Sequence, residues 1–308
     1  RGLGDVYKRQ VLETFEIPPQ FDLDIIQDRQ SLSDITVRAL ERLAPLLEAQ
    51  QPDAVLVQGD TTTTFAGALA AFYRRIPVVH LEAGLRTSDP AAPFPEEINR
   101  RLTTQVAALH LTPTWSSRAN LLRENISADQ VLVTGNTVID AMLWALAREP
   151  RESSELLDRL TREPRRLLLV TAHRRESWGP PLEAIGRALA RLARSEPDLV
   201  IVLPMHRNPV VREALAPALE SLDNVITTEP LPYDTFVRLM ARADVVLTDS
   251  GGIQEEAPSL GKPVLVMRDT TERPEAVDAG TASMVGTDEE AIVAAVQRLL
   301  HDDTAYQR

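Results

Sequence analysis

The sequence predicts an α/β protein built from parallel sheets that helices cover on both faces. Continuous apolar runs of strand length alternate with amphipathic helical segments along the chain. Polar and glycine-rich motifs follow the apolar runs, as expected where loops gather at the carboxyl edge of a parallel sheet. The length of 308 residues suggests two domains, each long enough to bury its own core.

The first half of the chain shows this alternation up to the Gly135-Asn136 turn. The expected strands are 54–57, 77–81, 109–112 and 131–133, and the expected helices are 63–73, 96–106 and 116–123. A helix over 138–148 comes next. The segment 148–164 is charged and contains two prolines, which suits a hinge or a surface helix. We place the first domain at 1–136 and the second at 137–308.

The same pattern restarts in the second domain. The expected strands are 167–170, 199–202, 225–227, 245–247 and 264–267. The expected helices are 182–194, 209–219, 233–241 and 253–260. Strands and helices of these lengths are typical of a parallel sheet with crossover helices.

Composition excludes several classes of function. The net charge of −12 argues against bulk binding to nucleic acid or to an anionic membrane, although a local basic pocket can still hold an anion. The absence of cysteine excludes disulfides, thiolate metal sites and cysteine nucleophiles. No apolar run reaches the length of a membrane span, and no secretory signal is visible. We expect a soluble cytoplasmic protein.

The most informative motif runs from Ser250 to Glu256, between an apolar run and a helical pattern. A strand, a glycine turn and a helix start together make an anion site, because unpaired backbone N–H groups point at one spot. Ser250 adds a hydroxyl donor, Gly251 and Gly252 allow close approach of a phosphate, and Glu256 can bind sugar hydroxyls. An ordinary strand-to-helix turn is the alternative, and the motif alone leaves both open.

Three carboxylates follow the strands of the first domain. Asp60, Glu82 and Glu96 are candidates for acid/base chemistry, since clustered carboxylates shift one another's pKa values apart. Structural alternatives exist for each. Asp60 can cap the next helix, Glu82 can pair with Arg86, and Glu96 can be an ordinary first-turn acid beside Glu97. His80, on the strand before Glu82, is expected to be a satisfied core histidine.

Cationic side chains follow strands of the second domain. His173 and Arg174 come after the first of them, which favours recognition of phosphate or carboxylate over a surface loop paired with Glu176. His206 repeats the theme one strand later, where a plain turn is the stronger reading. Arg273 can reach a diphosphate or pair with neighbouring glutamates. We find neither a metal-ligand spacing nor a dinucleotide-binding glycine fingerprint.

Taken together, these motifs resemble the non-hydrolysing UDP-N-acetylglucosamine (UDP-GlcNAc) 2-epimerase family. Each is short, but their order and spacing are highly specific. The matching runs are Gln58-Gly59-Asp60-Thr61, His80 to Thr87, Pro95 to Arg100, Thr134-Gly135-Asn136-Thr137, His173-Arg174-Arg175-Glu176, Asp249 to Pro258 and Arg268 to Pro274.

The resemblance implies a fold and a reaction. The family has two Rossmann-like, doubly wound domains in the arrangement called GT-B, with the active site in the cleft between the domains. It interconverts UDP-GlcNAc and UDP-N-acetylmannosamine (UDP-ManNAc) with no redox cofactor, and we expect no cofactor and no metal here. A base removes the C2 proton while UDP leaves C1, and UDP then adds back to the bound 2-acetamidoglucal.

The resemblance also implies roles for individual residues. Asp60, Glu82 and Glu96 become the acid/base candidates, and His173 assists the departing UDP. Substrate contacts would come from eight residues of the second domain. The diphosphate cradle is Ser250, Gly251 and Gly252, with Glu256 at the ribose, Arg273 at the nucleotide-sugar, Phe236 near uracil, and Arg174 and His206 as further substrate-binding residues.

Both ends of the chain depart from the family pattern. Residues Arg1 to Arg9 do not resemble the family's first strand, or its following glycine, threonine, arginine, proline and glutamate run. The usual closing segment beyond residue 308 is also not seen. We therefore expect a fragment without epimerase activity of its own, whose first half is less stable than its second.

Two other functions stay open at this point. A hydrolysing epimerase would release free N-acetylmannosamine, and a GT-B glycosyltransferase would share the nucleotide site without needing three carboxylates around C2. A third reading, a nucleotide-sugar-binding module, would bind UDP without turnover. The resemblance also implies a homodimer, and the charge argues against nucleic-acid and membrane partners.

Overall fold

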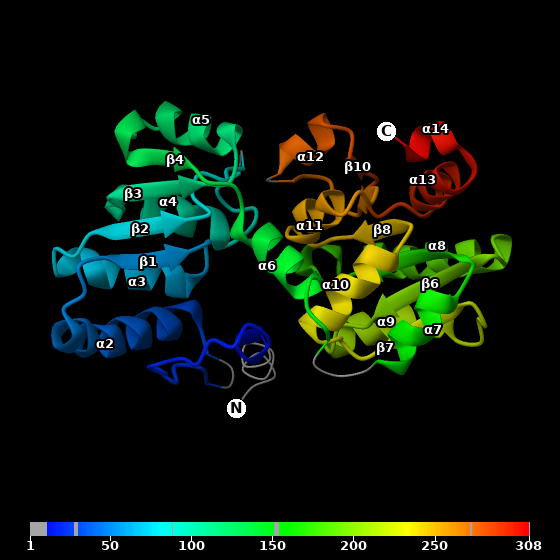
Figure 1. Ribbon diagram of the computed structural model, residues 1–308, viewed down its shortest axis with the longest axis horizontal. Helices are drawn as coiled ribbons and strands as arrows, with labels where there is room; N and C mark the ends of the chain where they lie inside the picture. Colours follow the sequence, from blue (N-terminus) through cyan, green and yellow to red (C-terminus); the bar gives the residue numbers. More distant parts are fainter. Residues whose placement is uncertain (1–10, 28–29, 88, 151–153, 272, 308) are drawn as a thin grey trace. The chain divides into compact units, whose positions relative to one another are not determined.

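The computed structural model describes residues 11–27, 30–87, 89–150, 154–271 and 273–307. The chain divides into two compact units, Arg1–Thr137 and Val138–Arg308. Each unit contains one parallel sheet flanked by helices (Figure 1). The fold class predicted from the sequence, α/β with two parallel-sheet domains, is therefore confirmed. The segment Arg1 to Arg9, for which the sequence predicts a departure from the family pattern, lies outside the described residues.

The sheet of the first unit has four strands, in the chain order β1-β2-β3-β4. Helix α2 packs on α3, and α3 packs on α4 and β1. The strands are β1 (Val55–Gln58), β2 (Val78–Leu81), β3 (Leu109–Thr112) and β4 (Val131–Val133). The helices are α2 (Leu32–Gln50), α3 (Thr62–Tyr73), α4 (Glu96–Val106) and α5 (Trp115–Arg123).

Pairing of β1 with β2 sets the position of the first two carboxylates. Gln58, the last residue of β1, pairs with Leu81, the last residue of β2. Asp60 and Glu82 follow these two positions closely in the chain. Since parallel strands end at the same edge, both carboxylates leave the sheet side by side.

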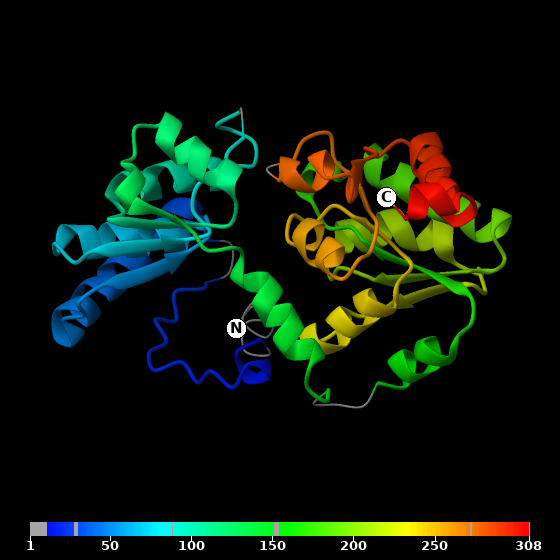
Figure 2. The same cartoon turned by 45° about the horizontal axis from the view of Figure 1, so that its top comes forward.

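The second unit is a six-stranded sheet with helices on both faces (Figure 2). Its strands are β5 (Arg166–Thr171), β6 (Leu199–Pro204), β7 (Val225–Thr228), β8 (Val245–Thr248), β9 (Val264–Val266) and β10 (Ala282–Met284). Its helices are α6 (Thr137–Leu146), α7 (Glu155–Arg162), α8 (Pro180–Ser195), α9 (Pro209–Leu219), α10 (Tyr233–Arg242), α11 (Ile253–Ser259), α12 (Pro274–Asp278), α13 (Glu289–His301) and α14 (Asp303–Tyr306). Part of the charged segment 148–164 is therefore a helix, α7.

The strand order β10-β9-β8-β5-β6-β7 is that of a doubly wound dinucleotide-binding fold. The chain winds outward from β5 to β7, returns to the centre at β8, and then winds outward on the other side. Thr171 and Thr248, at the ends of β5 and β8, pair in register, with 2.6 Å between their hydroxyl oxygens. In sheets of this kind ligands bind where the winding reverses, outside the carboxyl ends of these two strands.

Continuous burial of β5 explains why its sequence is an unbroken apolar run. Leu168 and Val170 face a core that includes residues of α8, α9 and α13. Leu167 and Leu169 face the opposite core, which includes residues of α6, α7, α10 and α11. Both faces are covered, so no polar alternation remains in the strand.

Candidate functional site

Asp60 lies in the turn between β1 and α3, and it does not cap that helix. Thr61 is the N-cap of α3 and accepts a hydrogen bond from the N–H of Thr64. The Asp60 carboxylate instead accepts a 2.6 Å hydrogen bond from Nη1 of Arg100, on α4. Its side chain is 29% exposed, so the carboxylate is anchored on one side and open to a ligand.

Glu82 follows β2 in a strained conformation. Its φ of 63° lies in the left-handed region, which costs a residue other than glycine about 1–3 kcal/mol and is often found at functional sites. Oε2 of Glu82 lies 3.7 Å from the place where a Cβ of Gly59 would be, so Glu82 reaches toward the Asp60 turn. Arg86, the partner of Glu82 in the structural alternative, forms a bidentate pair with Glu124 instead.

Glu96 and Glu97 begin α4 and have different surroundings. Glu97 is fully buried and accepts hydrogen bonds from the N–H of Thr87 and from the guanidinium groups of Arg100 and Arg101. Glu96 is half-buried, and its side chain makes no hydrogen bond or ion pair with any described residue. Glu96 is thus the carboxylate with free capacity at this helix start, whereas Glu97 is a structural anchor.

His80 contacts the main chain of the turn that contains Asp60. It is fully buried, and its Nε2 lies 2.8 Å from the carbonyl oxygen of Gly59. Burial lowers the pKa of His80 to about 4, so the ring is neutral at pH 7 and donates from Nε2. Its Nδ1 has no hydrogen-bond partner among the described residues, so this core histidine is only half satisfied.

In the second unit, Asp249 joins the ends of β5 and β8. Its fully buried carboxylate accepts hydrogen bonds from the backbone N–H of His173 at 2.6 Å and of Arg174 at 2.7 Å. Nδ1 of His173 lies 2.8 Å from Oδ1 of Asp249. Burial opposes ionisation of Asp249, but His173 and the two backbone donors outweigh it, and its pKa stays below the usual range.

Two other basic side chains of this edge, His206 and Arg174, come from the loops around the same carboxylate. The rings of His173 and His206 stack with 5.9 Å between their centroids. Burial, together with the charge of His173, lowers the pKa of His206. Nε of Arg174 is buried and bonded to no described residue, and a buried N–H of this kind is costly unless a ligand binds it. Glu176, the alternative partner, pairs with Arg268.

The turn Ser250-Gly251-Gly252 connects β8 to α11. The N–H of Ser250 is held by the hydroxyl of Thr248 at 2.9 Å. Gly252 has helical dihedral angles, φ −63° and ψ −42°, and no side chain caps α11. Backbone N–H groups at the start of this helix are therefore available to an acceptor, as the sequence predicts.

Glu256 lies one turn into α11 and is almost fully buried. Its Oε1 accepts a 3.1 Å hydrogen bond from the hydroxyl of Tyr233, on α10. Burial raises the pKa of Glu256, and burial together with the nearby carboxylate raises the pKa of Tyr233. Phe236, on the next turn of α10, is partly buried against the core. Sequence reasoning did not single out Tyr233.

Arg273 begins the α12 segment and is bound to a residue of α11. Its guanidinium forms an ion pair with Glu255, next to Glu256 in the chain. Its neighbour Glu272, a possible partner, lies outside the described residues. The structure thus brings Arg273, Glu256 and the Ser250 turn to one helix, α11.

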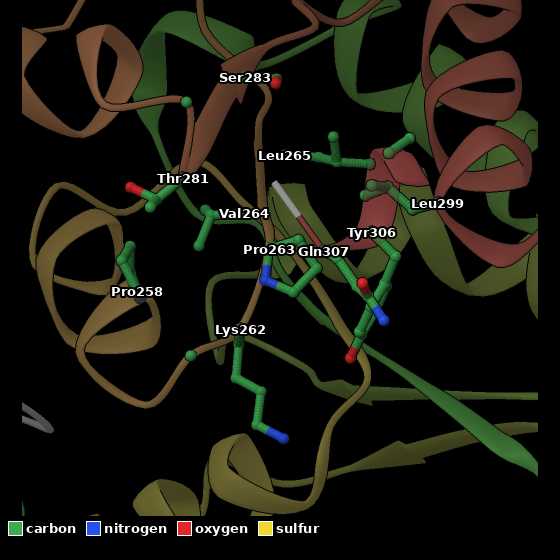
Figure 3. A pocket seen from close by; sticks show the side chains of 13 residues that line it. Pro258, Lys262, Pro263, Val264, Leu265, Thr281, Ser283, Leu299, Tyr306 and Gln307 are labelled. Carbon is green, nitrogen blue, oxygen red and sulfur yellow. The ribbon is translucent and has the colours of Figure 1, made fainter. Parts of the chain in front are cut away.

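A separate cavity lies at the opposite edge of this sheet. It has a volume of about 220 Å³ and is lined by residues that include Lys262, Val264, Thr281 and Tyr306 (Figure 3). Lys262 and Thr281 precede β9 and β10, whereas the Asp249 cluster follows the ends of β5 and β8. The cavity is therefore not part of the candidate site.

Among the described residues, no group of three or more His, Cys, Asp or Glu side chains is placed to hold a metal ion. No helix in this part of the chain is both long enough and apolar enough to cross a membrane.

Comparison with known proteins identifies the family. The model of the family described as UDP-N-acetylglucosamine 2-epimerase matches residues 3–308. The protein named UDP-N-acetylglucosamine 2-epimerase from Yersinia pestis is 54% identical over 97% of this chain and 81% of its own length. The relative of the same name from Bacillus subtilis is 50% identical over 97% of this chain and 78% of its own length.

Solved structures agree with the sequence comparison. The crystal structure of UDP-GlcNAc 2-epimerase from Neisseria meningitidis bound to UDP-GlcNAc superposes with a TM-score of 0.92. It is 46% identical and covers 98% of this chain and 82% of the other. The structure from Methanocaldococcus jannaschii in complex with UDP-GlcNAc and UDP is 32% identical, with a TM-score of 0.81 over 97% of this chain and 86% of the other. The chain belongs to the UDP-N-acetylglucosamine 2-epimerase family.

Proposed function

We propose that the protein, as expressed from its own gene, interconverts UDP-GlcNAc and UDP-ManNAc by elimination and re-addition of UDP. The observation that carries this is the carboxylate cluster of the first unit. Asp60 is bonded to α4, the helix that Glu96 begins, and Glu82 reaches to the turn that holds Asp60. Inversion at C2 needs a base on one face of the sugar and an acid on the other, and a set of three carboxylates supplies both.

The reaction proceeds in two steps, an elimination and a re-addition. A carboxylate removes the C2 proton, the bond from C1 to the β-phosphate oxygen breaks, and 2-acetamidoglucal and UDP remain bound. A second carboxylic acid then delivers a proton to C2 on the other face while the UDP oxygen bonds to C1. Asp60, Glu82 and Glu96 are the groups that carry these protons.

The second unit holds the departing UDP. His173, oriented by Asp249, faces the leaving diphosphate, and Arg174 and His206 add positive charge or donors beside it. The turn Ser250-Gly251-Gly252 offers backbone N–H groups to the phosphates. Glu256 contacts the ribose, Arg273 the nucleotide-sugar and Phe236 the uracil region. Holding UDP in place makes the return step effectively intramolecular.

Partners and location follow from the same proposal. The enzyme acts as a cytoplasmic homodimer on UDP-GlcNAc. The net charge of −12 supports the proposal that the protein does not bind nucleic acid.

The test is incubation of the purified protein, as expressed from its own gene, with UDP-GlcNAc in deuterated water. We expect UDP-ManNAc with deuterium at C2, and deuterium at C2 of the recovered UDP-GlcNAc, both seen by NMR. Products that retain hydrogen at C2 contradict the proton-transfer route. Free N-acetylmannosamine with UDP would identify a hydrolysing enzyme, and transfer of the sugar to an acceptor would identify a glycosyltransferase.

A further inference from the structure

A buried guanidinium connects two carboxylates of the first unit. Nη2 and Nε of Arg100 lie 2.6 and 3.3 Å from Oε2 of Glu97, and Nη1 lies 2.6 Å from Oδ2 of Asp60. Arg100 is 1% exposed and Glu97 is fully buried. Nε and Nη2 of the guanidinium therefore bind the structural carboxylate of Glu97, and Nη1 binds the candidate acid/base group, Asp60.

Glu97 fixes the direction in which Arg100 points. Its second oxygen, Oε1, binds Arg101 at 2.8 Å, and its first also accepts from the N–H of Thr87. A buried carboxylate with this many donors has a single favourable orientation, and so does the planar guanidinium paired with it. Arg100 is held before any substrate arrives.

The main chain of Asp60 is fixed independently of Arg100. Asn99 donates from Nδ2 to the carbonyl oxygen of Asp60 at 2.9 Å. His80 holds the carbonyl of the preceding Gly59 at 2.8 Å. The bond from Arg100 thus acts on the carboxylate itself and sets its rotation about the side-chain bonds.

Among the described residues, Arg100 is also the one hydrogen-bond partner of the Asp60 carboxylate. Oδ2 is occupied by Nη1, and Oδ1 is left for proton transfer. A guanidinium stays charged at every working pH, so it holds this orientation throughout.

We propose that Arg100, held by Glu97, is a positioning residue that fixes the Asp60 carboxylate so that one defined oxygen exchanges the proton at C2. This rests on the proposed function, which gives Asp60 its part in proton transfer. The effect belongs to turnover and not to substrate binding, because Arg100 is buried behind Asp60 and acts through it.

The experiment is a double-mutant cycle with Arg100→Gln, Asp60→Asn and the double variant, in the protein as expressed from its gene. We expect Arg100→Gln to lower kcat about 10²-fold, the effect that a misplacement of about 1 Å has on a reacting group. KM and the calorimetric affinity for UDP should change less than about threefold. The double variant should be no slower than Asp60→Asn alone, because Arg100 has nothing left to position.

Two further variants separate positioning from folding. Arg101→Gln removes a guanidinium from the same Glu97 but not from Asp60, and the 40% exposure of Arg101 makes it the milder change. Its kcat should stay within about threefold of the wild type, although it loses a similar bond. Arg100→Lys keeps the charge beside Glu97 but cannot reach both carboxylates, so it should fold and still lose at least about tenfold in kcat.

Each outcome decides a different point. A wild-type kcat in Arg100→Lys or Arg100→Gln overturns the inference, and so does a double variant whose losses multiply. If Arg100→Gln does not fold, Arg100→Lys carries the same decision. A wild-type kcat in Asp60→Asn overturns the role of Asp60 in the proposed function, which is a separate failure.

Discussion

The imidazole of His173 contacts the carboxylate of Asp249, with 2.8 Å between Nδ1 and Oδ1. The two residues are 76 positions apart in the chain, at the ends of the two central strands of one sheet. A carboxylate beside Nδ1 favours the tautomer that carries its hydrogen on Nδ1. We therefore expect a substitution in this pair to affect both the stability of the second unit and the proposed binding of UDP.

The first prediction is that Asp249→Asn destabilises the protein and impairs catalysis. The amide cannot accept from two backbone N–H groups and pair with His173 at once, and loss of one member of a buried pair costs about 3–5 kcal/mol. Urea unfolding at pH 7 measures this difference. An unfolding free energy equal to that of the wild type would contradict the role given to the pair.

The destabilisation should also depend on pH. The folded-state pKa of Asp249 is depressed, so its ionisation stabilises the protein above the unfolded value of about 3.9, and this contribution is lost as the pH falls through the folded value. The difference between the wild type and Asp249→Asn should therefore be constant from pH 7 to about pH 5 and shrink below about pH 4. A constant difference down to pH 3 would show that the carboxylate charge is not responsible.

The second prediction concerns the three carboxylates. Asp60→Asn, Glu82→Gln and Glu96→Gln should each lower kcat by roughly 10²–10⁴-fold, the usual loss when a general acid or base is removed. Affinity for UDP, measured by calorimetry, should stay near the wild-type value. Glu124→Gln provides a control, since it removes a carboxylate of the same unit that is paired with Arg86. Near-normal turnover in any of the three would remove that residue from the mechanism.

The third prediction concerns the glycine turn before α11. A Cβ at Gly252 would lie 3.6 Å from Oε2 of Glu256, an ordinary contact, and its dihedral angles suit any residue. Gly252→Ala should therefore leave thermal stability nearly unchanged, while the larger Gly252→Val should block phosphate approach and weaken UDP binding at least tenfold. Unchanged UDP affinity in Gly252→Val would mean that the turn is only structural.

The fourth prediction concerns Gly84, in the loop after Glu82. Its φ is +87°, and a Cβ would lie 2.3 Å from the carbonyl oxygen of Ser117. Gly84→Ala should destabilise the first unit by about 1–3 kcal/mol more than Gly135→Ala, because overpacking adds to the backbone strain. Gly135 is a matched control, since its φ is +79° and nothing lies within 4 Å of its Cβ position. Equal melting temperatures for the two variants would contradict the packing argument.

Most strands of both sheets were predictable from sequence because each contains a short apolar run. The run from Leu167 to Val170 belongs to β5, and the run from Val131 to Val133 is β4. Strand β10, by contrast, is the three residues Ala-Ser-Met at a sheet edge, too short and too mixed to carry a pattern. Its existence depends on pairing with β9, which sequence does not show.

Helices α2 and α13 are absent from the sequence-based expectations, although their signals are present. Ser31 and Asp34 form a capping box at the start of α2, and Asp288 caps α13 before two further acids. Pro45 inside α2 weakens the helical pattern there. These helices could have been found from their caps.

The contacts of the candidate site were harder to foresee than its residues. Sequence proximity offered Arg86 as a structural partner for Glu82, but Arg86 pairs with Glu124, 38 positions away. The bond between Asp60 and Arg100 spans 40 positions, and that between His173 and Asp249 spans 76. Tertiary packing decides which side chains become such partners. Motifs in the sequence therefore indicate candidate residues but not their hydrogen-bond and ion-pair partners. The roles of the site residues stay predictions.

The central position of β8 has a consequence for how the protein matures. Within the second unit, strands β5, β6 and β7 are synthesised before β8, and this sheet gains its fourth strand only when the chain returns to pair with β5. Until then His173 has no counter-ion, because Asp249 is delivered with the returning strand. A nascent or partly opened chain therefore lacks the contact between His173 and Asp249, however well its first strands are formed. Because this pairing is long-range, the proposed UDP-binding edge forms only after β8 has joined the sheet.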